Sequence, residues 1–270
     1  MRTPAFTLIE LLVVITIIVV LLALLMPALD RAIYQAELAA CAANLKGIAT
    51  GVTLYAMEHK RSYPPRDANA PGYQPHLIEK AAGTGRDSRE PIQDYITTKS
   101  FMDPLTPDID YEVRDGADIY VPYNMWWSWR YGDPPQPKTK PRTTRMGSPF
   151  TWTEEVEAKE YEFYLLVGDY DETWDGGAWS NHPDRDGLMW HPDEENALNP
   201  ISSDFRIFIS RWYSANGQRG PLDLNFAYQD NSMQRLTDLS VQDDERTVKT
   251  PQTMGGNTVS RYTRLPLPLP

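Results

Sequence analysis

The chain is poor in cysteine and in positive charge. Its 270 residues include one cysteine, Cys41, so an intramolecular disulfide is excluded. Lysine and arginine number 26 against 37 aspartates and glutamates, which gives a formal net charge of −11. An acidic chain without a basic stripe does not suit the phosphate backbone of nucleic acid. We therefore expect no nucleic-acid partner.

Motifs that commonly mark enzymes are also missing. The sequence has no Gly-x-Ser-x-Gly nucleophile turn, no glycine-rich phosphate loop and no dinucleotide fingerprint. Carboxylates are plentiful, but their presence in acidic loops does not by itself indicate acid–base catalysis. No repeat of solenoid length is visible. We expect a protein that is not an enzyme.

One long apolar run is present near the start of the chain. From Leu11 to Leu29 only Thr16 and Pro27 are not plainly apolar. A helix over this run rises about 28 Å, close to the roughly 30 Å of a bilayer core. A secretory signal peptide has a shorter apolar core with a small residue after it, whereas the small residue Ala5 precedes this run. The run predicts a transmembrane helix.

Glu10 is an ionisable residue at the beginning of this apolar segment. A charge at the centre of a membrane costs about 2.5–3.5 kcal/mol on insertion scales, so it usually has a partner. A carboxylate close to the helix start can instead extend its side chain to the membrane interface. Position alone leaves both interpretations open.

The segment Ala5-Phe-Thr-Leu-Ile-Glu-Leu-Leu-Val-Val-Ile15 resembles the class III signal of type IV prepilins and type II secretion pseudopilins. The resemblance implies that a prepilin peptidase cuts between Ala5 and Phe6 and that Phe6 then becomes N-methylated. It implies that Glu10 is the carboxylate required for subunit assembly. Pro27 stands where many pilins have a helix-kinking proline. Ala5 departs from the glycine that usually precedes the cut.

The same resemblance implies a single-pass protein of the bacterial inner membrane. Residues 1–5 form the cytoplasmic leader and residues 6–29 the transmembrane helix, with the following domain in the periplasm or in an extracellular filament. The implied partners are the prepilin peptidase and methyltransferase, the membrane, and other pilin or pseudopilin subunits that contact the N-terminal helix. The implied function is a structural subunit of a pilus-like or pseudopilus filament. The alternative is a membrane-anchored binding module that uses this anchor without long filaments.

The helix is predicted to continue beyond the membrane as an amphipathic segment over residues 30–60. Apolar residues recur there at spacings of four and three, which places them on one helical face: Tyr34, Leu38, Cys41, Leu45, Ile48, Val52 and Tyr55. Gly47 and Gly51 each weaken a helix by about 1 kcal/mol relative to alanine, and they allow another backbone to approach closely.

The C-terminal end of this helix has a sequence signal. Pro64 and Pro65 end the apolar pattern, so we predict one helix from about Thr7 to about His59. A bend or local unwinding is expected near Pro27, because proline removes one backbone hydrogen bond.

Two further segments are similar to pilin-like proteins that are common in planctomycete-type bacteria. The first runs from Cys41 to Pro65 and includes Cys-Ala-Ala-Asn-Leu-Lys-Gly-Ile and Tyr-Pro-Pro. The second, a looser similarity to the closing strand of that group, covers Asp223–Met233. This chain has Asp230-Asn231 there in place of the group's Asp-Gly.

Residues 61–249 are predicted to form a domain with an antiparallel sheet that covers the helical stripe, giving an α+β, pilin-like fold. Alternation and β-branched or aromatic residues predict these strands: Asp118–Tyr123 at an edge, Tyr161–Val167, Asp204–Trp212 and Leu224–Tyr228. Residues 66–115 are expected to be irregular, with a short helix at Ile92–Ile96. Residues 250–270 end in Leu-Pro repeats and predict an extended tail.

The segment Met125–Tyr131 holds four aromatic residues within seven positions. Such a run could stack on sugars or grip a partner, or it could fill a core or a subunit contact. We favour the packing interpretation.

One acidic region is a candidate metal site. Its carboxylates are Asp169, Asp171, Asp175, Asp184 and Asp186, and such hard oxygen donors suit calcium. Their spacing does not fit an EF-hand, but some pseudopilins hold calcium in a C-terminal loop, so the resemblance favours it. His182 and His191 leave zinc as an alternative, and turn-forming polar residues are a third. The sequence establishes no cofactor, and calcium is the candidate.

Overall fold

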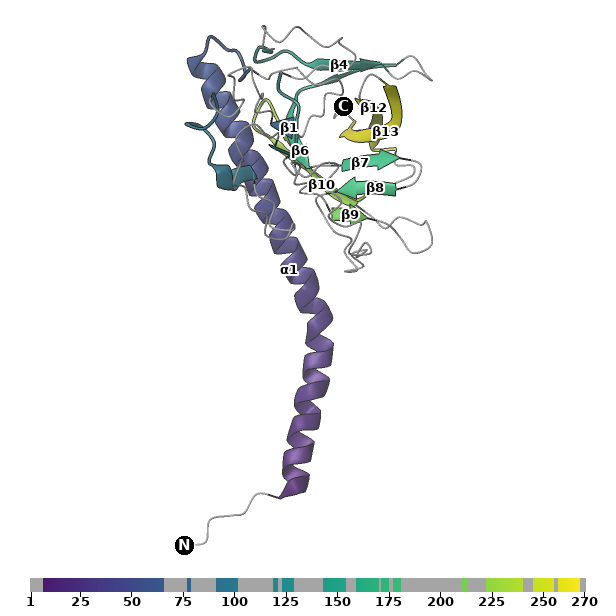
Figure 1. The fold of residues 1–270 in the computed structure, drawn as a ribbon. Coiled ribbons are helices and arrows are strands. Elements are labelled where there is room, and N and C mark those ends of the chain that lie inside the picture. Colours follow the sequence, from purple (N-terminus) through teal and green to yellow (C-terminus); the bar gives the residue numbers. More distant parts are fainter. Residues whose placement is uncertain are drawn as a thin grey trace.

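The computed structural model describes residues 7–65, 77–78, 91–101, 119–120, 123–128, 143–153, 159–169, 171–174, 177–180, 210–212, 222–239, 245–254 and 257–267. A long helix, α1 (Leu8–Glu58), extends far beyond a head of antiparallel strands, and the head packs on its C-terminal half (Figure 1). The predicted α+β class is confirmed.

The helix has the predicted limits. It is 51 residues long, which corresponds to about 77 Å at 1.5 Å per residue. Thr7 is the N-cap, with extended φ and ψ of −87° and 149°, and His59 is the C-cap. Lys60 and Arg61 follow with φ of 54° and 61°, and these left-handed conformations turn the chain away from the helix axis.

The sequence predicts either a bend or local unwinding near Pro27. The unwinding is wrong, because the helix continues unbroken through this residue. In the view of Figure 1 the helix changes direction gradually between its lower and upper halves. Proline lacks a backbone N–H, and the remaining hydrogen bonds of the neighbouring turns keep the helical path.

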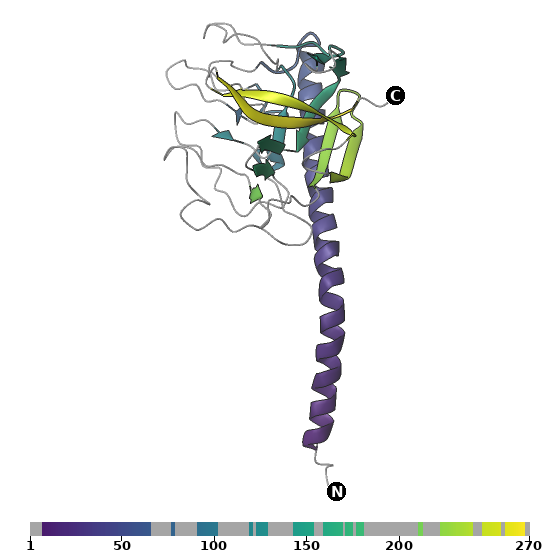
Figure 2. The same ribbon diagram turned by 90° about the vertical axis from the view of Figure 1, so that its right-hand side faces the viewer.

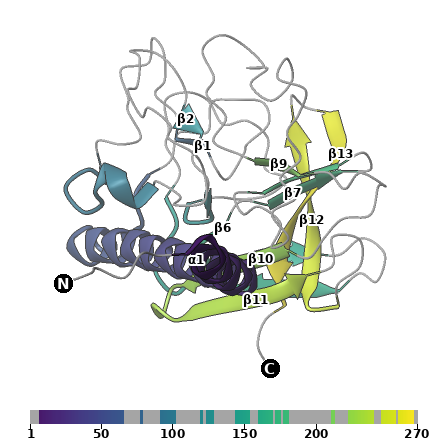
Figure 3. The same ribbon diagram turned by 90° about the horizontal axis from the view of Figure 1, so that it is seen from below.

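A four-stranded antiparallel sheet lies against α1. Its order is β11 (Met233–Leu239), β10 (Leu222–Tyr228), β6 (Leu165–Asp169) and β3 (Tyr123–Met125). Figure 3, which views the molecule from below, shows α1 beside β6 and β10, the two central strands. The strand predicted at Leu224–Tyr228 is confirmed, and β3 occupies an edge of the sheet.

The strand predicted at Tyr161–Val167 is divided between two sheets at Tyr164. Its first part, β5 (Glu160–Phe163), pairs with β4 (Phe150–Thr153) in a separate hairpin, and its second part is β6. The Tyr164 carbonyl accepts a hydrogen bond from the backbone of Gln229 at 2.8 Å, outside both ladders.

The remaining described elements are short, apart from one hairpin. They are β1 (Leu77–Ile78), η1 (Thr98–Phe101), β2 (Ile119–Tyr120), β7 (Asp171–Trp174), β8 (Gly177–Ser180), β9 (Ser210–Trp212), β12 (Thr247–Met254) and β13 (Asn257–Pro266). The short helix expected at Ile92–Ile96 is one hydrogen-bonded turn, closed by the Ile96 N–H on the Ile92 carbonyl at 2.8 Å. Only β9 of the strand predicted at Asp204–Trp212 falls within the described residues.

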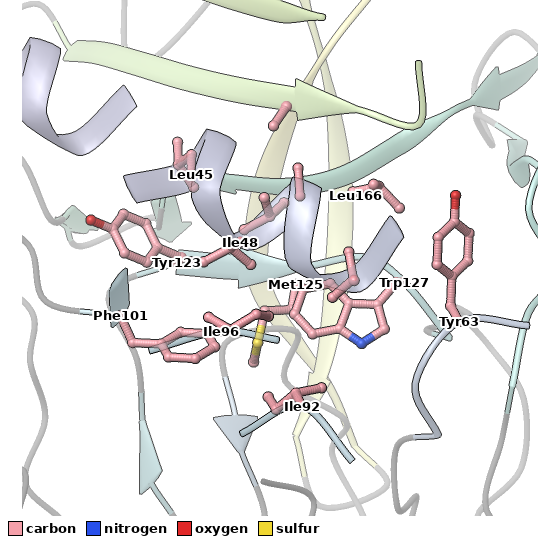
Figure 4. Close-up of a cluster of buried hydrophobic side chains, with 14 of the residues drawn as sticks. Leu45, Ile48, Tyr63, Ile92, Ile96, Phe101, Tyr123, Met125, Trp127 and Leu166 are labelled. Atoms are coloured by element: carbon pink, nitrogen blue, oxygen red, sulfur yellow. The ribbon is translucent and has the colours of Figure 1, made fainter. Parts of the chain in front are cut away.

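The helix-side core lies between α1 and the four-stranded sheet (Figure 4). The predicted stripe supplies its centre, since Leu45, Ile48 and Val52 are completely buried. The other members come from the same helix, the segments after it, and the sheet with its flanking residues: Ala49, Ala56, Tyr63, Ile92, Ile96, Phe101, Tyr123, Met125, Trp127, Leu166, Val167 and Ala227. The predicted packing of the sheet on the stripe is therefore confirmed.

An outer core lies on the other side of the four-stranded sheet, under the hairpins β4–β5 and β12–β13. Its buried members are Trp126, Phe163, Leu165, Leu224, Phe226, Leu236, Leu239, Val248 and Leu265. The neighbouring residues Trp126 and Trp127 thus belong to different cores, and each is 3% exposed. The packing interpretation of the aromatic run is confirmed for these two, while Trp129 and Tyr131 lie outside the described residues.

The extended tail predicted for residues 250–270 is wrong as far as Pro266. Strands β12 and β13 form a hairpin, seen in yellow in Figure 2, and β13 also pairs with β7. Val248 and Leu265 face each other across the ladder and are buried in the outer core. Burial of these apolar side chains fixes a segment whose local Leu-Pro composition favours an open chain.

The turn between β10 and β11 explains the Asp230-Asn231 pair. Asn231 has a φ of 65°, in the left-handed region that glycine adopts freely and asparagine tolerates. The Asp230 carboxylate accepts the Ser232 N–H at 2.9 Å, and hydrogen bonds from the Ser232 side chain and backbone lower the pKa of Asp230. Asparagine can thus hold the position where the resemblance implies glycine.

Candidate functional site

The N-terminal half of α1 is the most distinctive surface of the described molecule. Every residue from Leu8 to Ile33 is exposed, and almost all of them are apolar. Within the described part of the chain, this helix alone is long and apolar enough to cross a bilayer. Its apolar side chains have no cover from the head, so lipid or other protein chains must keep them from water.

Glu10 lies at the N-terminal end of this surface and has a partner in its own helix. Its Oε2 atom accepts the Thr7 backbone N–H and the Thr7 hydroxyl, each at 2.8 Å. The Glu10 N–H donates in return to the Thr7 Oγ1 at 3.3 Å. This reciprocal arrangement is a capping box, and the positive end of the helix dipole also favours the carboxylate.

Sequence reasoning expected the partner of Glu10 in another chain and missed Thr7. The signal was available, because Thr7-x-x-Glu10 followed by an apolar run is the capping-box pattern. The bonds fix the carboxylate on the first helical turn, four residues after Phe6 in the sequence. Among the described residues, no hydrogen bond uses the other oxygen, Oε1. Ala5 and Phe6 themselves lie outside the described residues.

The carboxylate of Asp169, the first candidate calcium ligand, lies inside the head. Asp169 is 1% exposed, and its Oδ2 accepts the backbone N–H and the side-chain amide of Asn225 at 2.6 and 2.8 Å. Its backbone also supports β3, because its carbonyl accepts the Asn124 amide at 3.4 Å. These contacts give Asp169 a structural role in joining β6 to its neighbours.

The other candidate metal ligands are not brought together by the described residues. Asp171 begins β7, which belongs to a different sheet from β6. Asp175, Asp184, Asp186 and both candidate histidines, His182 and His191, lie outside the described residues. Within the part that is described, no group of three or more His, Cys, Asp or Glu side chains gathers. Calcium binding stays a prediction.

Comparison with known proteins supports the assignment of the N-terminal segment. Residues 2–26 match the family model described as the prokaryotic N-terminal methylation motif, and this range includes Ala5, Phe6 and Glu10. The match and the long apolar helix that follows are consistent with a type IV pilin-like protein. The comparison with curated proteins found no match, and neither did the comparison with solved structures.

Proposed function

We propose that this chain, which begins with a prokaryotic N-terminal methylation motif, is a structural subunit of a pilus-like or pseudopilus filament. The observation that carries the proposal is the capped Glu10 at the end of an uncovered apolar helix, within the matched range. The helix anchors the unassembled subunit in the inner membrane. The head, packed on the distal half of the helix, then faces the periplasm or the outside of the filament.

Processing prepares the N-terminus for assembly. A prepilin peptidase hydrolyses the peptide bond between Ala5 and Phe6, which releases residues 1–5 and leaves a positive amine on Phe6. Methylation of that nitrogen keeps its positive charge. The cut removes Arg2, so the new amine becomes the cationic group nearest to Glu10 in the sequence.

Glu10 then sets the position of one subunit against the next. Its Oε2 is held by Thr7, and no described residue donates a hydrogen bond to its Oε1, so the carboxylate can pair with a cation. The Phe6 amine of a neighbouring copy is such a cation. Attraction between these charges is much stronger in apolar surroundings than in water. The surrounding leucine, isoleucine and valine side chains pack without directional preference, so this pair fixes the axial register.

The test follows cleavage and assembly of Glu10→Ala in the same cells. We expect the variant to insert in the membrane and to be cut after Ala5, with an N-methylated Phe6 found by mass spectrometry. It should fail to form filaments or cross-linked oligomers. Thr7→Val is the matched control, because it removes the hydroxyl bond and leaves the carboxylate and the backbone N–H in place.

Three outcomes separate the possibilities. Normal assembly of the cleaved Glu10→Ala protein would exclude the register role. An intact Met1 terminus in cells that contain the peptidase would contradict processing altogether. A wild-type protein that is cleaved but stays monomeric in the membrane would favour the alternative, a membrane-anchored binding module.

A further inference from the structure

The helix meets the head at a sharply defined point. Each residue of α1 before Tyr34 is exposed, and Tyr34 is the first that is partly buried. Leu38 and Cys41, one and two turns later, are completely buried and form a small cluster with Tyr34, separate from the two larger cores. The junction between the free and the packed part of the helix thus falls at Tyr34.

The first contact at this junction joins a phenol to a buried carboxylate. The Tyr34 hydroxyl donates to the Oδ2 atom of Asp223 on β10 at 3.0 Å. Asp223 is completely buried, and its Oδ1 accepts the backbone N–H of Asp238 on β11 at 3.0 Å. One side chain therefore holds the helix to two strands.

One turn later, a chain of hydrogen bonds reaches the helix backbone. The Nη2 atom of Arg235 donates to the Leu38 carbonyl at 3.1 Å, and its Nε donates to the Oδ1 of Asn225 at 2.8 Å. Asn225 is buried and donates twice to the Oδ2 of Asp169 on β6. Three adjacent strands, β11, β10 and β6, are thereby connected to one carbonyl of α1.

These contacts differ in kind from those further along the helix. From Leu45 to Ala56 the helix packs mainly through apolar side chains, which tolerate small shifts along or around the helix axis. Hydrogen bonds to carboxylates and to a carbonyl hold only over a narrow range of distance and angle. The polar contacts fix the helix where the apolar contacts are fewest.

We propose that Tyr34, Asp169, Asp223, Asn225 and Arg235 form a junction clamp that sets where the helix leaves the head. The clamp holds the turns from Tyr34 to Ala42 on the sheet, so bending of the membrane half is confined to the helix before Tyr34. Pro27, which lacks one helical hydrogen bond, lies within that free part. The inference does not depend on filament formation, since any membrane-tethered head needs a defined joint.

The test is amide hydrogen exchange of the full chain in detergent micelles, read by mass spectrometry. Tyr34→Phe and Arg235→Gln each remove one branch of the clamp. Tyr95→Phe is the matched control, because it removes a similar phenol–carboxylate bond, from Tyr95 to Glu58 at 2.5 Å, at the far end of the helix. The loss of a hydrogen bond to a charged group predicts about tenfold or faster exchange for amides 34–42 in Tyr34→Phe. Exchange of amides 45–56 should stay unchanged.

Two results from the clamp variants would overturn the proposal. One is unchanged exchange at 34–42 in both clamp variants while the protein remains folded. The other is an increase spread equally over 34–56, which would show general loosening. If Arg235→Gln unfolds the head, the test rests on Tyr34→Phe alone, because that variant removes only one hydroxyl group. Tyr95→Phe should leave residues 34–42 at the wild-type rate, and acceleration there would also contradict a local clamp.

Discussion

Gly51→Ala offers a direct measure of how closely the head approaches the helix. Gly51 is buried, and a methyl group there would lie 2.4 Å from the Ile96 Cγ1 and 2.8 Å from the Tyr95 carbonyl oxygen. Both distances are shorter than those found for real Cβ contacts. The Ile92–Ile96 turn cannot move away from the helix freely. The Tyr95 ring packs edge-on against Tyr55, and the Tyr95 hydroxyl is bonded to Glu58.

Gly47→Ala is the matched control on the same helix. Gly47 is exposed, and the nearest atom to an added methyl is the Ser100 hydroxyl oxygen at 3.8 Å, an ordinary contact. Replacing glycine with alanine inside a helix stabilises it by about 1 kcal/mol, and both variants share this gain. Only Gly51→Ala also pays for overpacking, which costs about 1–3 kcal/mol.

The two variants should therefore differ in stability, with Gly47→Ala the more stable. Gly47→Ala should raise the free energy of unfolding by about 1 kcal/mol, and Gly51→Ala should lie about 1–3 kcal/mol below it. For a head of this size each kcal/mol shifts the melting temperature by about 2–4 °C. Thermal unfolding of the full chain in micelles, followed by near-ultraviolet circular dichroism, measures both. Equal melting temperatures for the two variants would refute the close approach.

Other expectations follow from the cores, the tyrosines and the acidic region. Leu45→Asp places an unpaired charge at a completely buried site and should abolish cooperative unfolding. Leu54→Asp, at a position 47% exposed, should melt near the parent protein. Similar melting of both variants would mean that the stripe faces no core. Burial raises the pKa of Tyr63 to about 12, so the unfolded chain ionises first as pH rises, and stability should fall between about pH 10 and 12 by up to about 2–3 kcal/mol. Tyr63→Phe should remove that loss in alkaline urea titrations and should cost nothing at neutral pH, because the hydroxyl has no hydrogen-bond partner among the described residues; an unchanged alkaline slope would contradict this. If the acidic region binds calcium, millimolar calcium should raise the melting temperature and Asp184→Asn with Asp186→Asn should cancel the rise, while no shift in the parent would count against a site.

The helix could be predicted in detail because its signals are local. The spacing of the apolar stripe and the pair Pro64-Pro65 act within a few residues of the feature they determine. The transmembrane half and the methylation motif are equally local, since length and residue order alone define them. The burial of Leu45, Ile48 and Val52 follows from the same periodicity.

The features that escaped prediction depend on distant partners. Asp169 stands in a run of glycine and aspartate typical of a loop, and its buried role follows from Asn225, 56 positions away. Leu265 stands among prolines that favour an open chain, and it is fixed by Val248 and by the outer core. Tyr164 interrupts an otherwise good strand pattern only because the two flanking segments pair with different neighbours. No local spacing contains this information.

The separation of Trp126 and Trp127 into different cores has a consequence for how the head melts. Adjacent residues of one chain cannot move independently, so loss of packing around either indole displaces the backbone that holds the other. The Trp126 backbone N–H is also bonded to the Leu166 carbonyl at 2.7 Å, which ties this pair to the central strand β6. The two cores, although separated by a sheet, should therefore unfold together in one calorimetric transition, with the van't Hoff and calorimetric enthalpies in agreement.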